Sequence, residues 1–316
     1  MQSIEMLKLH KQVRFSGTFR LRDADFRETK DGRIFLKFYM EDSTGELPSF
    51  IWEKDLDPGL CFPDYTLVQV EGTTRILNGH LLANVRRIAL AKEKRAGEVL
   101  RLIPQSLSPI TGLLAELEFV FRQISIPVLK NFVEGVFADD GIAFPFISVP
   151  ASLYHHHNYP GGLLLHSLQS IQMLERYREC SREEYELGIV AMLFHDIGKI
   201  QTLTNKMTCT SLGRWIDHDK ITLEVLSPFL RKLEQQWEQG AQQLRYMLTW
   251  KISKPVPKYD MADVVACCDR LSAGLDLKIS NRKPHLAALP AKYPVAAGNV
   301  TVALPQERYW SKRRTA

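Results

Sequence analysis

Residues 13–90 alternate between apolar and polar side chains with a period of two, which is the pattern of half-buried β-strands. Residues 33–40 show it most clearly, because one face there is apolar and the other carries Phe35, Lys37 and Tyr39. Asn78-Gly79 separates two further apolar runs, and this dipeptide is the strongest short signal for a β-hairpin. The pattern therefore predicts five short strands, at residues 13–22, 33–42, 46–52, 67–77 and 80–90.

From Thr111 onward the apolar residues recur at steps of three and four, the period of an amphipathic α-helix. A short charged segment, residues 92–97, separates the two patterns, and Pro104 and Pro109 keep the next stretch from forming one long helix. We expect an α+β multidomain chain with three parts: a small antiparallel β-barrel at residues 1–95, an all-α domain at residues 96–290 and a basic tail at residues 291–316.

Five short antiparallel strands fit a Greek-key barrel of the OB type, an architecture that binds single-stranded nucleic acids. The face that alternates with the barrel core combines aromatic rings with cations, as grooves for single strands do. Its candidate contact residues are Phe35, Lys37, Tyr39, Trp52, Arg75 and Arg86. Residues 42–52 also resemble the D-x-T-G turn and following strand of OB-fold nucleic-acid-binding domains. The alternative is that these aromatic side chains pack against the helical domain.

The composition is that of a globular protein and argues against membrane-bound, secreted and disulfide-rich classes of protein. The chain has 316 residues, of which 45% are hydrophobic and 24% charged. No stretch approaches the roughly 20 apolar residues that cross a bilayer, and the N-terminus lacks the pattern of a secretory signal, so we expect a cytoplasmic protein that is not bound to a membrane. Five cysteines without regular spacing argue against a disulfide framework. The net charge of +5 permits a polyanionic partner.

The pair His195-Asp196 directly follows an apolar helical segment. An imidazole and a carboxylate at a helix end are both good ligands for a divalent ion, so the pair forms half of a candidate metal site. His166 and Asp269 lie in the helical segments before and after it and complete the order H…HD…D. Together with the Gly-Lys that follows the pair, this order resembles the HD superfamily of metal-dependent phosphohydrolases.

Residues 153–166 carry the most specific resemblance. Their sequence, LYHHHNYPGGLLLH, is similar to a signature of the YhaM-type 3′–5′ exoribonucleases, which join an N-terminal OB-fold to an HD domain. The triple histidine with Tyr-Pro-Gly-Gly is also similar to the HD nuclease domain of MobH-type conjugative relaxases. The Pro-Gly-Gly turn brings the triple histidine near His166 by chain geometry. The other interpretation of residues 155–157 is a polar loop with incidental metal affinity.

The resemblance implies a role for each matching position. It makes four residues the metal ligands, namely His166, His195, Asp196 and Asp269. Lys199 becomes a phosphate contact, and His156 and His157 become pocket residues. His218 matches the histidine of a G-x-x-x-x-H motif in the same pattern. The pattern also has a Ser-His-His-Gly motif where residues 244–254 of this chain contain no histidine, so we expect one tightly held ion per chain.

Such a site suits the hydrolysis of phosphoesters, because a divalent ion with open positions neutralises phosphate charge and lowers the pKa of water. The mixed nitrogen and oxygen ligands suit Mn, Fe, Co or Ni, and Mg is also compatible. Lys199 and His218 are candidates to stabilise the phosphate oxygens, and one of the histidines at 155–157 is a candidate to move a proton to the leaving oxygen. The sequence does not decide which one.

Three functions are compatible with these residues. The first is a metal-dependent phosphodiesterase, a 3′–5′ exonuclease by resemblance, in which the barrel guides single-stranded RNA or DNA into the helical domain. The second is an HD hydrolase of small nucleotides or a MobH-like DNA-processing protein, whose activity would survive removal of residues 1–95. The third is a nonenzymatic nucleic-acid-binding module with a relict HD site, which the metal content of the purified protein would reveal.

Overall fold

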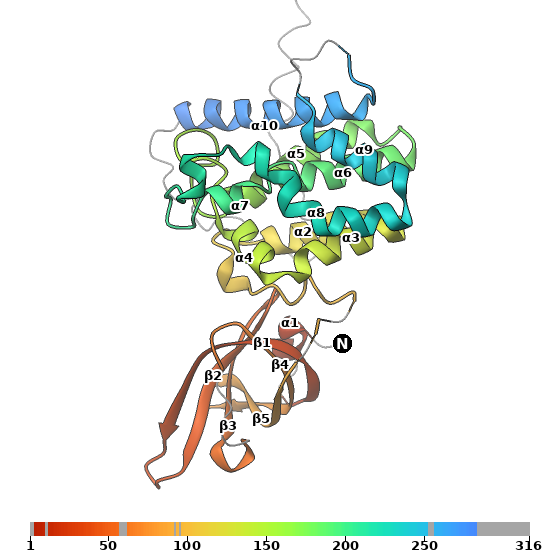
Figure 1. The fold of residues 1–316 in the computed structure, drawn as a ribbon. Helices are drawn as coiled ribbons and strands as arrows, with labels where there is room; N and C mark the ends of the chain where they lie inside the picture. Colours follow the sequence, from red (N-terminus) through yellow and green to blue (C-terminus); the bar gives the residue numbers. More distant parts are fainter. Residues whose placement is uncertain are drawn as a thin grey trace, which may run out of the picture. The chain divides into compact units, whose positions relative to one another are not determined.

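The computed structural model describes residues 3–9, 12–56, 62–91, 93–94, 96–251 and 256–282, with residues 275–282 as backbone only (Figure 1). The predicted basic tail at residues 291–316 lies outside the described residues, as do parts of the charged segment 92–97. Among the helices described, none is both long and apolar enough to cross a bilayer.

The N-terminal region is a closed barrel of the OB type, with the strand order β1-β2-β3-β5-β4. Its strands are β1 (Arg14–Glu28), β2 (Ile34–Asp42), β3 (Gly45–Trp52), β4 (Thr66–Leu77) and β5 (His80–Leu90). Asn78 and Gly79 form the predicted hairpin turn, with φ angles of 52° and 79°. One pairing differs from the antiparallel prediction: residues 49–51 of β3 run parallel to residues 83–85 of β5. This parallel pair closes the barrel.

Two elements of the barrel differ from the strand pattern. β1 continues past the predicted end at Arg22, through a bulge before Asp25, and pairs with β2 as far as Glu28. Residues 23–28 are mostly exposed, so backbone pairing rather than an apolar face holds them, and no alternation marks them in the sequence. The short helix α1 (Ile4–Leu9) was not predicted; it places Ile4 and Leu7 in the barrel core.

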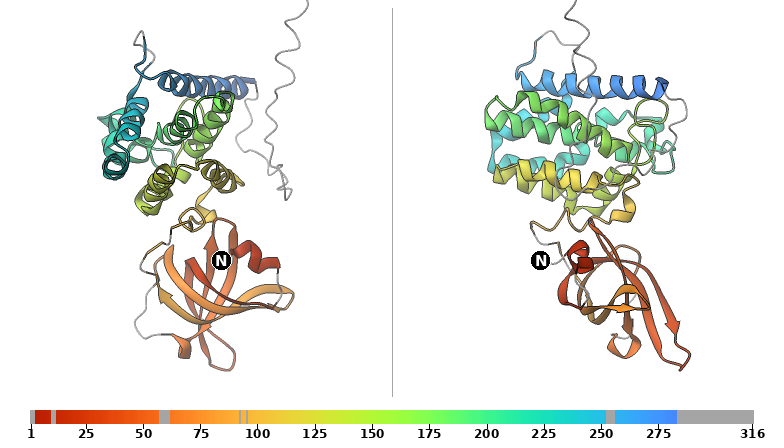
Figure 2. Two further views of the ribbon diagram at one scale, coloured as in Figure 1. Left: turned by 90° about the vertical axis from the view of Figure 1, so that its right-hand side faces the viewer. Right: turned by 180° about the vertical axis from the view of Figure 1, so that it is seen from behind.

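The rest of the described chain is mainly helical (Figures 1 and 2). The helices are α2 (Leu113–Gln123), α3 (Pro127–Ala138), α4 (Asp140–Ser148), α5 (Gly162–Leu174), α6 (Arg182–Phe194), α7 (Lys199–Thr202), α8 (His218–Gln236), α9 (Glu238–Thr249) and α10 (Met261–Arg282). Their core is separate from that of the barrel and includes the rings of Phe137, Phe146 and Phe194, which contact one another in T-shaped and tilted geometry with centroids 5.6–6.0 Å apart. Helix α10 packs beside α5 and α6, which is where the candidate site lies (Figure 2).

Candidate functional site

Helix α6 ends inside the helical core and so delivers the His-Asp pair to a buried position. Ser181 caps its start by accepting a hydrogen bond from the backbone N–H of Glu184. Every residue from Ile189 to Phe194 is buried, so the pair that follows stays in the protein interior. His195 itself forms the C-cap of the helix. The buried, apolar end of α6 therefore places His195 and Asp196, two polar side chains, in the protein interior.

Four side chains from α5, from the end of α6 and from α10 meet at this point. They are His166, His195, Asp196 and Asp269, and each offers one ligand atom within 4.8 Å of the other three. The two Nε2 atoms of His166 and His195 are 3.1 Å apart, and His166 Nε2 is 3.0 Å from Asp269 Oδ1. His195 Nε2 lies 3.4 Å from Asp196 Oδ2.

These separations fit one metal ion. Ligand atoms bound to one ion at about 2.1 Å lie about 3.0–3.4 Å apart, depending on whether the geometry is octahedral or tetrahedral. Hydrogen bonds on the far side of each ring orient both imidazoles. His195 Nδ1 donates to the carbonyl oxygen of Met192 at 2.8 Å, and His166 Nδ1 lies 3.1 Å from the hydroxyl of Ser272. The Nε2 lone pair of His195 is thereby directed to the shared centre, as outer hydrogen bonds do for metal-bound histidine.

Two further side chains contact the Asp196 carboxylate. Lys199 Nζ lies 2.5 Å from Oδ2, and His218 Nε2 lies 3.0 Å from Oδ1. His218 is the first residue of α8, and the start of this helix packs directly against the turn that follows His195-Asp196. A Cβ on Gly198 would lie 2.0 Å from the carbonyl oxygen of His218, so only glycine allows this approach. The glycine of the His-Asp-Ile-Gly-Lys segment thus sets the distance between His218 and Asp196.

The carboxylates dominate the electrostatics of the cluster. Burial alone would lower the pKa of His195, but the adjacent carboxylates of Asp196 and Asp269 raise it to about 10. Burial would raise the pKa of Asp269, yet its hydrogen bonds with His166 and His195 hold it well below the usual range. Two carboxylates that stay ionised in a largely buried site require positive charge beside them. The Lys199 ammonium and a protonated His195 meet that requirement in part, and a divalent cation bound in place of the His195 proton would meet it as well.

The loop of residues 149–161 between α4 and α5, here named the triple-histidine loop, also reaches the cluster around His166. Gly161, with a φ of 78°, turns the chain into α5, and Gly162 leaves room for the His157 carbonyl, which a Cβ would approach to 2.1 Å. The ring centroids of His156 and His157 lie 5.0 Å and 5.5 Å from that of His166. Burial and the neighbouring cationic groups lower the pKa of His156 to about 4 and that of His157 to about 3. His155 is exposed instead.

The structure thus brings together all eight residues that the sequence analysis assigned to the helical domain. Those residues are His156, His157, His166, His195, Asp196, Lys199, His218 and Asp269. Sequence reasoning missed Ser272, which lies three positions after Asp269 on the same face of α10 and contacts His166. Residues 252–255, within the segment that lacks the Ser-His-His-Gly motif, lie outside the described residues.

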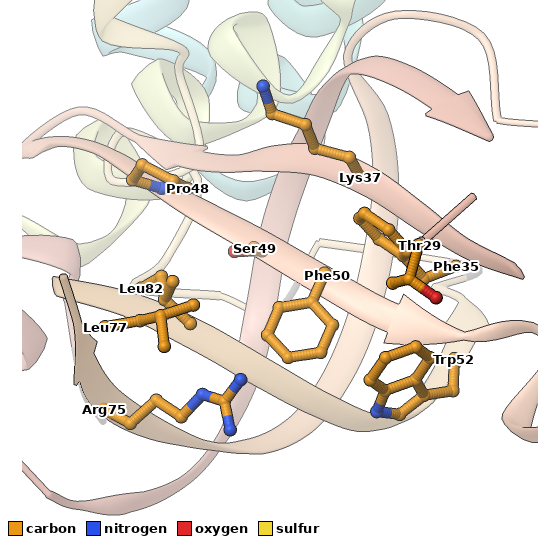
Figure 3. A pocket seen from close by; sticks show the side chains of 10 residues that line it. All are labelled: Thr29, Phe35, Lys37, Pro48, Ser49, Phe50, Trp52, Arg75, Leu77 and Leu82. Atoms are coloured by element: carbon orange, nitrogen blue, oxygen red, sulfur yellow. The ribbon is translucent and has the colours of Figure 1, made fainter. Parts of the chain in front are cut away.

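A second candidate surface lies on the barrel, in a pocket of about 280 Å³ lined entirely by barrel residues (Figure 3). The rings of Phe35, Phe50 and Trp52 pack edge to face, with centroids 5.7–6.1 Å apart. The guanidinium of Arg75 lies 5.1 Å from the ring centre of Phe50, and that of Arg33 lies 4.8 Å from Trp52. Aromatic faces beside cations are the features that hold single strands.

The predicted contact residues of the barrel divide into two groups. Phe35, Lys37, Trp52 and Arg75 line the pocket, together with Phe50, which the sequence analysis missed. Phe50 alternates with the buried Ile51, and that alternation could have revealed it. Tyr39 lies outside the pocket lining and packs 5.3 Å beneath Arg22. Arg86 is exposed at a bulge where β5 pairs with β4, and it does not line the pocket either.

The chain is similar over most of its length to proteins named 3′-5′ exoribonuclease YhaM. The protein from Listeria innocua is 21% identical over 262 residues, which are 78% of this chain and 81% of the relative. The protein from Bacillus subtilis is 20% identical with the same coverage. The resemblance to the YhaM-type exoribonucleases is confirmed. No protein-family model matches the chain.

Two solved structures are similar to part of the chain. The second OB-fold domain of replication protein A from Methanococcus maripaludis is 15% identical, with a TM-score of 0.24, and the match covers 30% of this chain and 99% of that one. The N-terminal domain of PriB protein from Thermoanaerobacter tencongensis is 24% identical, with a TM-score of 0.22, and the match covers 26% and 98%.

Proposed function

We propose that this protein is a metal-dependent 3′–5′ exonuclease that acts on single-stranded RNA, or on DNA, in the cytoplasm. The observation that carries the proposal is the cluster of His166, His195, Asp196 and Asp269, whose ligand atoms lie within 4.8 Å of one another. It occurs in a chain that is similar over 78% of its length to proteins named 3′-5′ exoribonuclease YhaM. RNA is the first substrate to test because the names of these relatives specify it.

The cluster would hold one divalent ion through two imidazole nitrogens and two carboxylate oxygens. That mixed set suits Mn, Fe, Co or Ni, and Mg is also compatible. When bound, the ion would supply Lewis acidity and a lower pKa for water at the site. The helical region would then be an HD-type phosphohydrolase domain. The order of ligands along α5, α6 and α10 supports this assignment.

The surrounding side chains have separate roles in the proposal. Lys199 and His218 each contact one oxygen of Asp196, so both lie beside the cluster and can donate hydrogen bonds to a phosphate there. His156 and His157 are neutral at pH 7 because their pKa values are lowered to about 4 and about 3. A neutral imidazole is a poor proton donor. We therefore assign these two histidines to hydrogen bonding and orientation. We assign proton transfer to the leaving oxygen to His218 because of its position beside Asp196.

The barrel pocket supports a single-stranded substrate over a small nucleotide. Phe35, Phe50 and Trp52 offer apolar ring surface, and Arg75 provides positive charge at the same place. Stacked bases gain free energy from such surfaces without regard to sequence. In this proposal the barrel retains the strand while the end of the strand is processed at the cluster.

End-labelled oligonucleotides test the reaction directly. The protein is incubated with single-stranded RNA and DNA, each labelled at the 5′ end or at the 3′ end, with Mn²⁺ or Mg²⁺. We expect a descending ladder from the 5′-labelled strand and a released mononucleotide from the 3′-labelled one, both abolished by EDTA. A single internal product, or release of mononucleotides from the 5′ end first, would contradict the 3′–5′ exonuclease.

One observation favours a second candidate, a nonenzymatic nucleic-acid-binding module. The Lys199 ammonium lies 2.5 Å from the Asp196 oxygen that faces the cluster, so part of the negative charge is already neutralised within the chain. Metal content separates the two candidates. A folded, freshly purified protein that retains no Mn, Fe, Co, Ni or Mg and binds none at micromolar concentration would favour the binding module.

A further inference from the structure

The two most exposed large hydrophobic side chains in the described part of the chain lie on the loop that precedes His218 and on the triple-histidine loop. Trp215 has 87% of its surface exposed and Tyr154 has 84%. Trp215 belongs to the loop of residues 203–217 between α7 and α8, here named the α7–α8 loop, and Tyr154 belongs to the triple-histidine loop. Leu212 and Ile216 of the α7–α8 loop are also exposed, by 39% and 40%. A single exposed apolar side chain is common, but a group of them, such as Leu212, Trp215 and Ile216 on this loop, is a feature of interaction sites.

The α7–α8 loop is fixed by internal contacts, so the exposure of Trp215 is a property of the fold. Leu203 and Cys209 form an isolated β-bridge, and Thr210 bonds back to the end of α7 through its N–H, at 2.9 Å from the Thr202 oxygen. A Cβ on Gly213 would lie 2.4 Å from that same oxygen, which shows how closely the loop packs there. The turn that follows then presents Trp215 outward.

Both aromatic residues are held near the cluster by the chain itself. Trp215 lies three positions before His218, whose Nε2 contacts Asp196. Three residues span at most about 10 Å, so the backbone of Trp215 lies within about that distance of the backbone of His218. Tyr154 lies two positions before His156, whose ring is 5.0 Å from that of His166. The two residues therefore lie on different loops, each within a few positions of a histidine of the candidate site.

The charges of the α7–α8 loop suit a nucleic-acid strand. Its charged residues are Lys206, Arg214 and Asp217, which leaves a net positive charge. Lys206 and Arg214 are exposed, and Arg214 immediately precedes Trp215. A cation next to an exposed indole provides both a phosphate contact and a stacking surface.

We propose that Trp215, assisted by Tyr154, stacks on the terminal bases of a single strand and so positions its last phosphodiester bond at the cluster. The inference rests on the proposed nuclease function and adds a specific binding surface to it. In this assignment Trp215 is a positioning residue, because its ring contacts the substrate base rather than the reacting phosphate. A protein partner on the same loop is the competing occupant, and the experiment below separates the two.

The test compares Trp215→Ala, Trp215→Phe and the wild-type protein on a single-stranded oligonucleotide and on the same oligonucleotide with abasic sites in place of its last two bases. We expect the alanine variant to raise KM for the normal strand by about 5- to 150-fold, which corresponds to about 1–3 kcal/mol for one lost stack, and to change kcat much less. The phenylalanine variant should recover most of the affinity. On the abasic strand, the KM values of wild type and alanine variant should converge.

Phe119→Ala is the matched control, since Phe119 is 61% exposed on α2, which contributes no residue to the site. It should leave KM unchanged. Equal KM values for wild type and Trp215→Ala on the normal strand would overturn the stacking proposal and leave the loop to a protein partner. An equal KM increase on normal and abasic strands would overturn it as well, because that loss would not depend on a base.

The proposal and the nuclease function can fail separately. If the wild-type protein yields no product from RNA or DNA, the proposed nuclease function fails. The stacking contact is then measured by fluorescence anisotropy with a labelled tetranucleotide in EDTA, where Trp215→Ala should bind about 5- to 150-fold more weakly than wild type. Unchanged binding there would overturn the inference on its own.

Discussion

His218 Nε2 lies 3.0 Å from Oδ1 of Asp196, while the other oxygen of that carboxylate faces the cluster. The imidazole therefore contacts a proposed ligand without being one of the four ligands. In the proposed function, substitution of His218 therefore tests catalysis separately from metal binding. It also bears on how many ions the site holds, because a second ion would need His218 as a ligand.

We expect His218→Ala to lower turnover on single-stranded RNA by about 10²- to 10⁴-fold, the usual contribution of a positioned acid or base. The variant should retain one equivalent of metal, because His166, His195, Asp196 and Asp269 remain in place. Elemental analysis and single-turnover kinetics measure the two quantities on the same preparation. Two equivalents in the wild type that fall to one in the variant would show instead a two-ion site.

The ligands themselves give a second prediction. Asp196→Asn removes the charge that the ion requires, and His195→Ala removes a nitrogen donor at the centre of the cluster. Both variants should lose bound metal and activity together. His80→Ala, at an exposed position of β5, is the histidine control and should retain both. A folded Asp196→Asn protein with stoichiometric metal and normal hydrolysis would refute the ligand assignment.

The candidate site of the helical region was largely predictable from the sequence because its proposed ligands lie at strongly marked positions. His195-Asp196 follows the apolar C-terminal half of a helix, and Pro160-Gly161-Gly162 marks the turn that brings the triple histidine back to α5. Helical period alone then places Ser272 on the same face as Asp269. The Met192 carbonyl that fixes the ring of His195 could not be predicted, because every helix has carbonyls and only the tertiary packing selects one.

The barrel was predictable to the same extent and for a similar reason. Alternation around Phe38 and the Asn78-Gly79 turn fixed the strands and one hairpin. Alternation says nothing about which strands become neighbours, so the parallel pairing of β3 with β5 was not foreseen. The outer face was also less uniform than the pattern indicated, since Tyr39 packs against Arg22 while Phe50 joins the pocket.

The barrel pocket yields a third prediction, on binding rather than hydrolysis. Phe50→Ala and Trp52→Ala should each weaken binding of a single strand by about 1–3 kcal/mol, because each removes a stacking surface from the pocket. Tyr39→Ala should have a smaller effect, since Tyr39 lies outside the pocket lining. Each variant is first shown to be folded by its thermal transition. Fluorescence anisotropy with an oligonucleotide long enough to reach the barrel then measures the affinity.

Phe26→Ala provides the control for these substitutions. Phe26 is 56% exposed on β1 and does not line the pocket, so its removal should leave the affinity within error of the wild type. If Phe50→Ala and Trp52→Ala bind as tightly as Phe26→Ala, the aromatic cluster serves packing rather than nucleic-acid binding.

Glu186 ties the start of α6 to the segment between α2 and α3. Its side chain is only 4% exposed and accepts hydrogen bonds from the backbone N–H groups of Ser125 and Ile126, at 2.9 Å and 2.8 Å, and from Arg182. Burial would raise the pKa of this carboxyl, but a hydrogen bond from the Ser125 hydroxyl, together with these backbone and Arg182 hydrogen bonds, lowers it below its usual value. Because α6 carries the His-Asp pair at its other end, this contact also supports the candidate site.

We therefore predict that Glu186→Gln lowers the free energy of unfolding by about 1–3 kcal/mol at pH 7, the usual cost of losing charge-assisted hydrogen bonds. A carboxyl whose folded-state pKa is lowered stabilises the protein above its unfolded pKa of about 4.3 and loses that contribution as the pH falls through the lower folded value. The difference in the free energy of unfolding between wild type and variant should thus have its full size at pH 6–7 and become smaller below about pH 4. Urea unfolding at each pH measures this difference.

Glu118→Gln, in the exposed pair with Arg122, is the control and should change the free energy of unfolding by less than about 0.5 kcal/mol at every pH. A Glu186 gap that stays constant from pH 7 to pH 3 would show that the carboxylate charge is not what holds α6.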